Sequence, residues 1–255
     1  MPETSFEAEL AAMKARIEPL ERLVQALANS LHPPLFYHSG QEHYGFRYGK
    51  PDVRHFCLLK AVRVISALNA AIALAHGGFA QEIAVLVRTV VEYTTHIDFV
   101  LDARDDTGVL EPEAEKYVQD YFADFARNSM ADFKKAQVRQ ITVHKRLGTT
   151  LDNIALQSSD VDQRVPAERM YSTVYLTYSN YVHAKYPEVM DLYGGKPGHF
   201  HLDGMLGTSK DDENLQYIDT FIDTTSTTLR LMVSRLRLHH LFEVDVGLGI
   251  WFRSQ

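Results

Sequence analysis

Residues 84–101, AVLVRTVVEYTTHIDFVL, decide the fold class of this chain. Alanine, valine and leucine fall on most sides of the helix that this stretch would form, which is typical of a helix covered by neighbours all round. Arg88, Glu92 and His96 interrupt the apolar surface at intervals of four residues, so they share one face. We therefore expect a central helix over about residues 79–103 that carries buried polar side chains.

An N-terminal helix is predicted over residues 1–31, capped by Thr4 and kinked or split at Pro19. Its apolar residues alternate three and four apart, as in a heptad seam. They are Leu10, Met13, Ile17, Leu20, Val24, Leu27 and Leu31. A narrow seam of this kind faces either the chain's own bundle or a second subunit. We expect a peripheral packing or dimerisation helix, and self-association through it.

Helix start and stop signals predict the remaining helices. Their expected ranges are 52–76, 112–147, 166–186 and 211–242. Residues 32–51 are predicted to be an aromatic loop packed on the body, and no stretch alternates well enough for a convincing sheet. The fold class is therefore all-α: one bundle of about six helices over 52–242, with the peripheral N-terminal helix and an apolar tail, 243–255, that docks on it.

Composition sets limits on compartment and partners. The 255 residues are 45% hydrophobic and 23% charged, which is ordinary for a globular protein. Cys57 is the single cysteine, so no internal disulfide forms and a reducing compartment is expected. The acidic, polar N-terminus is unlike a signal peptide, and no run of about 20 apolar residues suits a membrane span. We expect a cytoplasmic protein without a membrane partner. The formal charge of −7 argues against a globally basic face for nucleic acid.

A second polar row lies in MYSTVYLTYSNYVHAKY, where Tyr175, Ser179 and His183 are again four residues apart. If this row faces the first across the bundle, the side chains form one hydrogen-bonded cluster. In one reading the cluster is a structural clasp. In the other it is a site for a small anion. Its ligand-binding residues would then be Arg88, His96, Tyr175 and Ser179, and its catalytic residues His183 and Glu92.

The pattern Arg88-Thr89-x-x-Glu92, followed downstream by Tyr175-x-x-x-Ser179-x-x-x-His183, resembles the bacterial family catalogued as domain of unknown function 5677. The resemblance covers about residues 55–240. It implies an all-α fold and an intracellular bacterial origin, and it implies no established activity. The N-terminal seam helix lies outside it, as does the later HFHLD loop.

Helical ribonucleases of the HEPN superfamily use an arginine followed after four to six residues by a histidine. Arg139-x4-His144 and Arg235-x4-His240 match that spacing. With 16 arginines and 12 histidines in the chain, about two such matches arise by chance. RNA therefore stays an open partner and RNA cleavage an open activity.

Metal binding is suggested by the loop His199-Phe200-His201-Leu202-Asp203, because alternating residues of an extended segment point the same way. Two imidazoles and a carboxylate suit zinc or iron. No Glu-x-x-His pair of a di-iron bundle occurs, and the sequence identifies no cofactor. Two functions remain: a binding or interaction module, and a hydrolytic enzyme acting on RNA, a nucleotide or a phosphate ester, with or without a metal.

Overall fold

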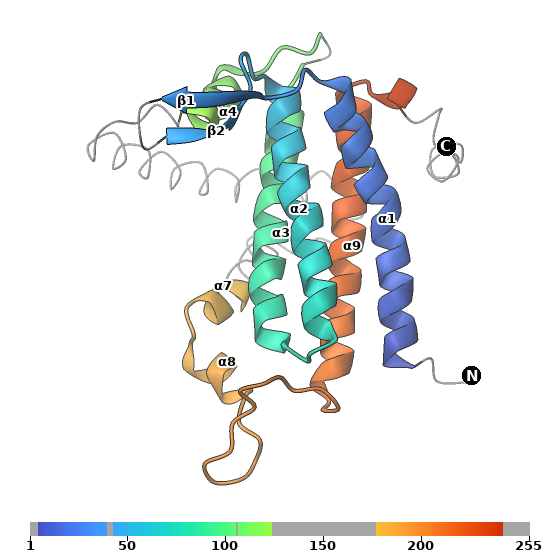
Figure 1. Cartoon of the computed structure of the whole chain (residues 1–255), viewed down its shortest axis with the longest axis vertical. Helices are drawn as coiled ribbons and strands as arrows, with labels where there is room; N and C mark the ends of the chain where they lie inside the picture. The colour runs from blue at the N-terminus through green and yellow to red at the C-terminus, as the bar shows by residue number, and fades with distance from the viewer. Residues whose placement is uncertain (1–4, 40–42, 106, 124–176, 242–255) are drawn as a thin grey trace, which may run out of the picture.

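The structure is a computed structural model that describes residues 5–39, 43–105, 107–123 and 177–241. Four long helices run alongside one another in it: α1 (Phe6–Ser30), α2 (Val53–Ala75), α3 (Ala80–Asp102) and α9 (Lys210–Arg235) (Figure 1). Shorter elements lie around them: the hairpin β1 (Leu35–Ser39) and β2 (His43–Arg47), α4 (Pro112–Ala123), α7 (Thr177–Val182), α8 (Tyr186–Met190) and the 3₁₀ helix η4 (His239–Leu241). The all-α fold class is confirmed.

Helix α3 is the central helix, as its sequence predicts. It packs against α2, α9, α7 and α4. Its buried side chains include Ile83, Val87, Val90, Ile97, Val100 and Leu101. Burial on this scale explains why apolar residues occupy most sides of the helix.

The turn between α2 and α3 depends on glycine. Gly78 has a φ of +71°, and a Cβ there would lie 2.3 Å from the backbone nitrogen of Leu206. The same close approach brings the Met205 amide to donate to the Gly78 carbonyl at 2.8 Å. The segment that leads into α9 is therefore fastened to this end of the bundle.

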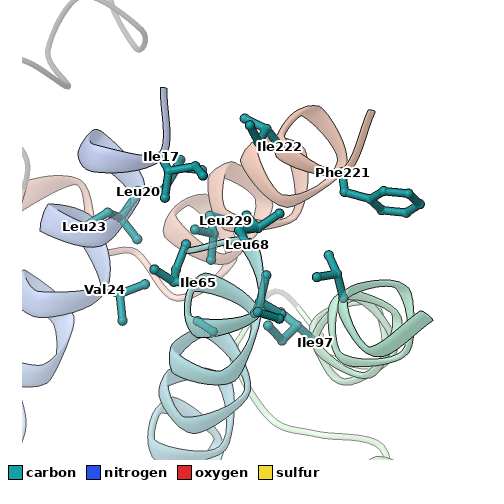
Figure 2. Packing of buried hydrophobic residues seen from close by; sticks show 14 of the residues in the cluster. Ile17, Leu20, Leu23, Val24, Ile65, Leu68, Ile97, Phe221, Ile222 and Leu229 are labelled. Carbon is teal, nitrogen blue, oxygen red and sulfur yellow. The ribbon is translucent and has the colours of Figure 1, made fainter. Parts of the chain in front are cut away.

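The apolar seam of α1 is buried by the chain's own bundle. Ile17, Leu20, Leu23 and Val24 lie against side chains of α2 and α9 such as Ile65 (Figure 2). The helix runs without interruption through Pro19. Ser5 caps it, its hydroxyl accepting from the Ala8 amide at 3.3 Å, whereas Thr4 lies outside the described residues.

Polar contacts also hold α1 in place. Arg16 forms ion pairs with Asp219 and Asp223 of α9. Lys14 donates to Asn69 of α2 at 2.6 Å. Because the seam is already occupied, self-association through this helix stays a prediction that would have to use its polar outer face. Sedimentation of the intact chain tests it.

The predicted loop at 32–51 is wrong in part, because β1 and β2 form an antiparallel hairpin there. Phe36 pairs with Phe46 across the strands, with ring centroids 5.6 Å apart, and the two residues are 62% and 66% exposed. The aromatics therefore do not all pack on the body. The sequence missed the strands because they are short and lack a two-residue turn signal between them.

Several predicted boundaries shift, and some predictions lie outside the described residues. Helix α9 ends at Arg235, whereas the sequence predicted an end at residue 242. Two residues after this end, Arg237 adopts a φ of +55°. Helix α8 occupies part of a predicted loop. Outside the described residues lie 124–147 of the predicted fourth helix, 166–176 of the fifth, and the tail 243–255.

Among the described helices, α2 alone is long and apolar enough by composition to cross a membrane, and more than half of its apolar window is buried inside the bundle. It packs against α1, α3, α4 and α9. A core helix needs the same composition.

Truncating the α1 seam should destabilise the whole bundle. Ile17 is fully buried, so Ile17→Ala should lower the free energy of unfolding by about 2–5 kcal/mol through lost burial and the cavity left behind. The neighbouring Glu18 is exposed, and Glu18→Ala should change it by less than about 0.5 kcal/mol. Urea unfolding of both variants is the measurement. Equal, small effects would show that α1 does not belong to the cooperative core.

Candidate functional site

The first polar row begins with an ion pair on α3. Arg88 Nη1 lies 2.5 Å from Glu92 Oε2, one helical turn away, and the side chains are 20% and 22% exposed. The shared face that the sequence predicted for these two residues therefore brings them together as a pair. The guanidinium that could have received an anion already faces a carboxylate.

His96, the third residue of that row, is buried in an aromatic layer between α3 and α4. Its ring lies 6.1 Å from that of Tyr93 and 5.6 Å from that of Tyr117, centroid to centroid. Burial raises the pKa of the Tyr117 hydroxyl, and the charge of Glu92 adds to the effect. The row therefore continues into packed aromatic surroundings.

Lys60 of α2 is a buried cation that the sequence did not single out. Its Nζ lies 4.6 Å from the ring centroid of Tyr93, 4.7 Å from that of Tyr121 and 5.5 Å from that of Phe56. Aromatic faces attract a cation most strongly where water is excluded. No carboxylate stands three or four residues from Lys60 in the sequence, so only the tertiary structure reveals its environment.

The second polar row is only partly described, because Tyr175 lies outside the described residues. Ser179 is half-buried on α7, which packs on α3. His183 follows the last residue of α7 and is exposed. The structure therefore places His183 on the surface rather than in a buried cluster with Arg88 and Glu92.

An open groove lies between α3 and α9. Its volume is about 430 Å³. The lining residues are Asp98 of α3 and, from α9, Asp219, Thr220, Asp223, Thr224, Thr227 and Thr228. The sequence showed the threonines only as poor helix formers in a long helix. Their position gives them a second role, since they line one wall of this groove.

Asp98 is the residue of this groove with the most unusual environment. Its Oδ2 accepts a hydrogen bond from the Thr228 hydroxyl at 3.1 Å, and its Oδ1 is buried without a hydrogen-bond partner among the described residues. Burial raises the pKa of the carboxyl to about 7, with a contribution from Asp102. A carboxyl with this pKa changes its protonation state near neutral pH.

The groove's other two carboxylates have a basic partner. Arg16 of α1 contacts both Asp219 and Asp223, whose side chains are 48% and 70% exposed. Asp98 is the third carboxyl of the groove, and no ion pair within the described residues joins it to Arg16. Sequence spacing could not have found it, since its neighbours come from a helix more than 100 residues later.

The predicted metal loop brings two of its three residues together. The rings of His199 and His201 lie 5.1 Å apart, centroid to centroid. Across residues 5–39, 43–105, 107–123 and 177–241, however, no three His, Cys, Asp or Glu side chains gather in a way that could hold a metal. Asp203 therefore does not complete a ligand set with the two histidines.

The structure also shows the surroundings of the remaining sequence motifs that lie within the described residues. Cys57 is fully buried, and burial raises the pKa of its thiol, so it packs rather than reacts. Arg235 closes α9 within 3.9 Å of Asp102, and His240 is exposed in η4. Arg139–His144 lies outside the described residues.

Comparison with known proteins adds the family. Residues 54–199 match the model described as Family of unknown function (DUF5677). The chain belongs to this family. No curated protein and no solved structure matches the chain. This match does not test the expected similarity to the HEPN ribonucleases.

The residues that match the DUF5677 model form only one of the two walls of the candidate groove. The matched range includes α2, α3, α4, α7 and α8, and with them Lys60, Arg88, Glu92 and Asp98. Helices α1 and α9 fall outside it. The threonine wall of the groove is thus supplied by a helix beyond the matched residues.

The exposed and the half-buried members of the predicted cluster should respond differently to mutation. His183→Ala should leave the free energy of unfolding within about 0.5 kcal/mol of the parent, because the side chain is exposed. Glu92→Gln should lower it by about 1–3 kcal/mol, because Arg88 loses its counter-charge in a largely covered position. Urea denaturation measures both changes. A larger loss of stability for His183→Ala than for Glu92→Gln would instead support a structural cluster centred on His183.

Asp98 should make the protein less stable as pH rises. In the folded state the carboxyl keeps its proton up to about pH 7, whereas in the unfolded chain it loses it near about pH 4. Between these values the folded state holds the extra proton, so the contribution of Asp98 to the free energy of unfolding falls with rising pH and is constant above about 7.

Asp98→Asn should remove this fall in the free energy of unfolding with rising pH, because an amide does not titrate. Relative to the parent, the variant should gain up to about 4 kcal/mol in the free energy of unfolding between about pH 4.5 and about pH 8. Urea unfolding at both pH values is the measurement. Thr227→Ala is the control, since that hydroxyl lines the groove but donates to the Asp223 carbonyl. A difference between parent and Asp98→Asn that is the same at both pH values would contradict the assignment.

Proposed function

We propose that this protein is a ligand-binding module whose site is the groove between α3 and α9. The observation that carries the proposal is the Asp98 carboxyl, largely buried in the wall of an open cavity, with a pKa of about 7. A volume of about 430 Å³ lies in the range of small-molecule sites. Perturbed carboxyls beside such cavities are frequent in binding sites.

The groove favours a cationic ligand. Its lining consists of three carboxyl side chains and four threonines, with Arg16 on two of the carboxylates. An anion would meet net negative charge there, whereas a protonated amine would pair with ionised Asp98 and donate to threonine hydroxyls. The small anion or RNA expected from the sequence has less support, because Arg88 already faces Glu92. The ligand class we propose is a small primary amine.

The single buried cysteine supports the compartment that we propose, and the exposed hairpin offers a surface for a protein partner. We place the module in the bacterial cytoplasm, where Cys57 stays reduced. Leu35, Phe36 and Phe46 offer an apolar surface that a partner could cover. Binding in the groove does not depend on that surface.

Amine binding is tested by calorimetric titration of the intact chain with 1,4-diaminobutane and with 1,4-butanediol as the uncharged match. The diamine should bind and the diol should not, because only the diamine supplies a cation for Asp98. Asp98→Asn should weaken binding at least about tenfold, since a charge-assisted hydrogen bond is lost. Glu18→Ala is the control, because it removes an exposed carboxylate of α1 that does not line the groove. Equal affinity of the parent and Asp98→Asn for the diamine, or of the parent for both compounds, would contradict the proposal.

Hydrolysis is the second candidate function, and the pKa of Asp98 is what favours it. A carboxyl that titrates near 7 can serve as a general acid or base at neutral pH. The same groove would then hold an uncharged carboxylic ester, because a phosphoester would meet net negative charge there. Turnover of such a substrate by the parent but not by Asp98→Asn would decide for the enzyme.

A further inference from the structure

The connection between α8 and α9 contains a short, ordered chain reversal. The His201 amide donates to the Leu192 carbonyl at 2.8 Å, and the Gly194 amide donates to the His199 carbonyl at 3.0 Å. Between them, the His199 amide donates to the Lys196 carbonyl at 3.0 Å. These bonds hold the two arms of the loop as a small antiparallel pair, which projects beyond the end of the bundle near α8 (Figure 1).

The residues of this pair alternate between its two sides. Tyr193 and Phe200 form the bridge pair, with ring centroids 5.4 Å apart. His199 and His201 flank Phe200, and alternation places them on the opposite side of the chain from it. The rings of the two histidines meet at 5.1 Å in an edge-to-face arrangement. The aromatic pair on one side thus fixes the imidazole pair on the other.

Gly194 makes room for the two imidazoles. A Cβ on Gly194 would lie 3.0 Å from His199 Nε2, 3.1 Å from His201 Nε2 and 2.3 Å from His199 Cδ2. Its backbone is outside the left-handed region that Gly195 and Gly198 adopt, so space rather than conformation requires glycine here. Both Nε2 atoms therefore approach the same point above Gly194.

We propose that His199 Nε2 and His201 Nε2 form a binding site for a divalent transition metal. Imidazole nitrogens suit Cu²⁺, Ni²⁺ and Zn²⁺, and for a given site the affinity is greatest for Cu²⁺. Mg²⁺ and Ca²⁺ prefer oxygen ligands and are not expected to bind.

The site is open rather than closed. Within the described part of the chain no third His, Cys, Asp or Glu joins the pair, so water or a ligand from another molecule fills the remaining positions. A structural zinc site would have four protein ligands. The metal is therefore exchangeable, and the site is independent of the Asp98 groove, whose walls are α3 and α9.

Copper titration of the intact, tag-free chain tests the site, with calorimetry for affinity and electron paramagnetic resonance for the ligands. The parent should bind Cu²⁺ with nitrogen ligands, more tightly than Ni²⁺ or Zn²⁺. His199→Ala and His201→Ala should each weaken Cu²⁺ binding at least about tenfold. Lys196→Ala is the matched loop control and should bind as the parent does. Circular dichroism checks that each variant is folded.

Gly194→Ala provides a second, independent variant. It keeps both imidazoles but places a methyl group where their Nε2 atoms converge, so it should also weaken Cu²⁺ binding. The proposal is overturned if the His199→Ala, His201→Ala double variant binds Cu²⁺ as tightly as the parent. It is equally overturned if only one of the two histidines matters, because the site requires both.

Discussion

Burial of α3 is the constraint on which the rest of the structure depends. The helix is flanked by α2, α9, α7 and α4, so each polar side chain that faces these neighbours must find a partner inside the bundle or lie at an opening. Arg88 meets this condition through Glu92, and His96 lies between two tyrosine rings. Asp98 meets it incompletely, through one hydrogen bond from Thr228.

This difference separates structural polar residues from a candidate site on the same helix. The Arg88–Glu92 pair is neutral as a unit and largely covered, which suits a clasp between turns of the helix. Asp98 keeps a proton to about pH 7 because burial disfavours its charge, and it borders a cavity. A ligand that supplies positive charge would relieve that cost, whereas Glu92 already has the positive charge of Arg88 beside it.

Local periodicity explains which parts of the fold the sequence predicted. Apolar spacing and helix start and stop signals located α1, α2 and α3, and the structure adds that Asp52 caps α2 through a capping box. The hairpin at 35–47 escaped prediction because its strands are five residues each and one carries a glycine. The site was predicted less well. Arg88 and Glu92 are four residues apart on one helix, so their pairing was readable, but the exposure of His183 was not.

The sequence by itself determined the all-α class, the central place of α3, the Arg88–Glu92 pair and membership of the family of unknown function. These features depend on residues within a few helical turns of one another or on motifs along the chain. Only the tertiary structure decided that α1 buries its seam against α2 and α9, that Lys60 lies among aromatic rings, and that Asp98 shares a groove with threonines of α9. Each of those outcomes depends on which distant side chains exclude water from a residue. Contacts between residues so far apart in the chain cannot be predicted from sequence spacing.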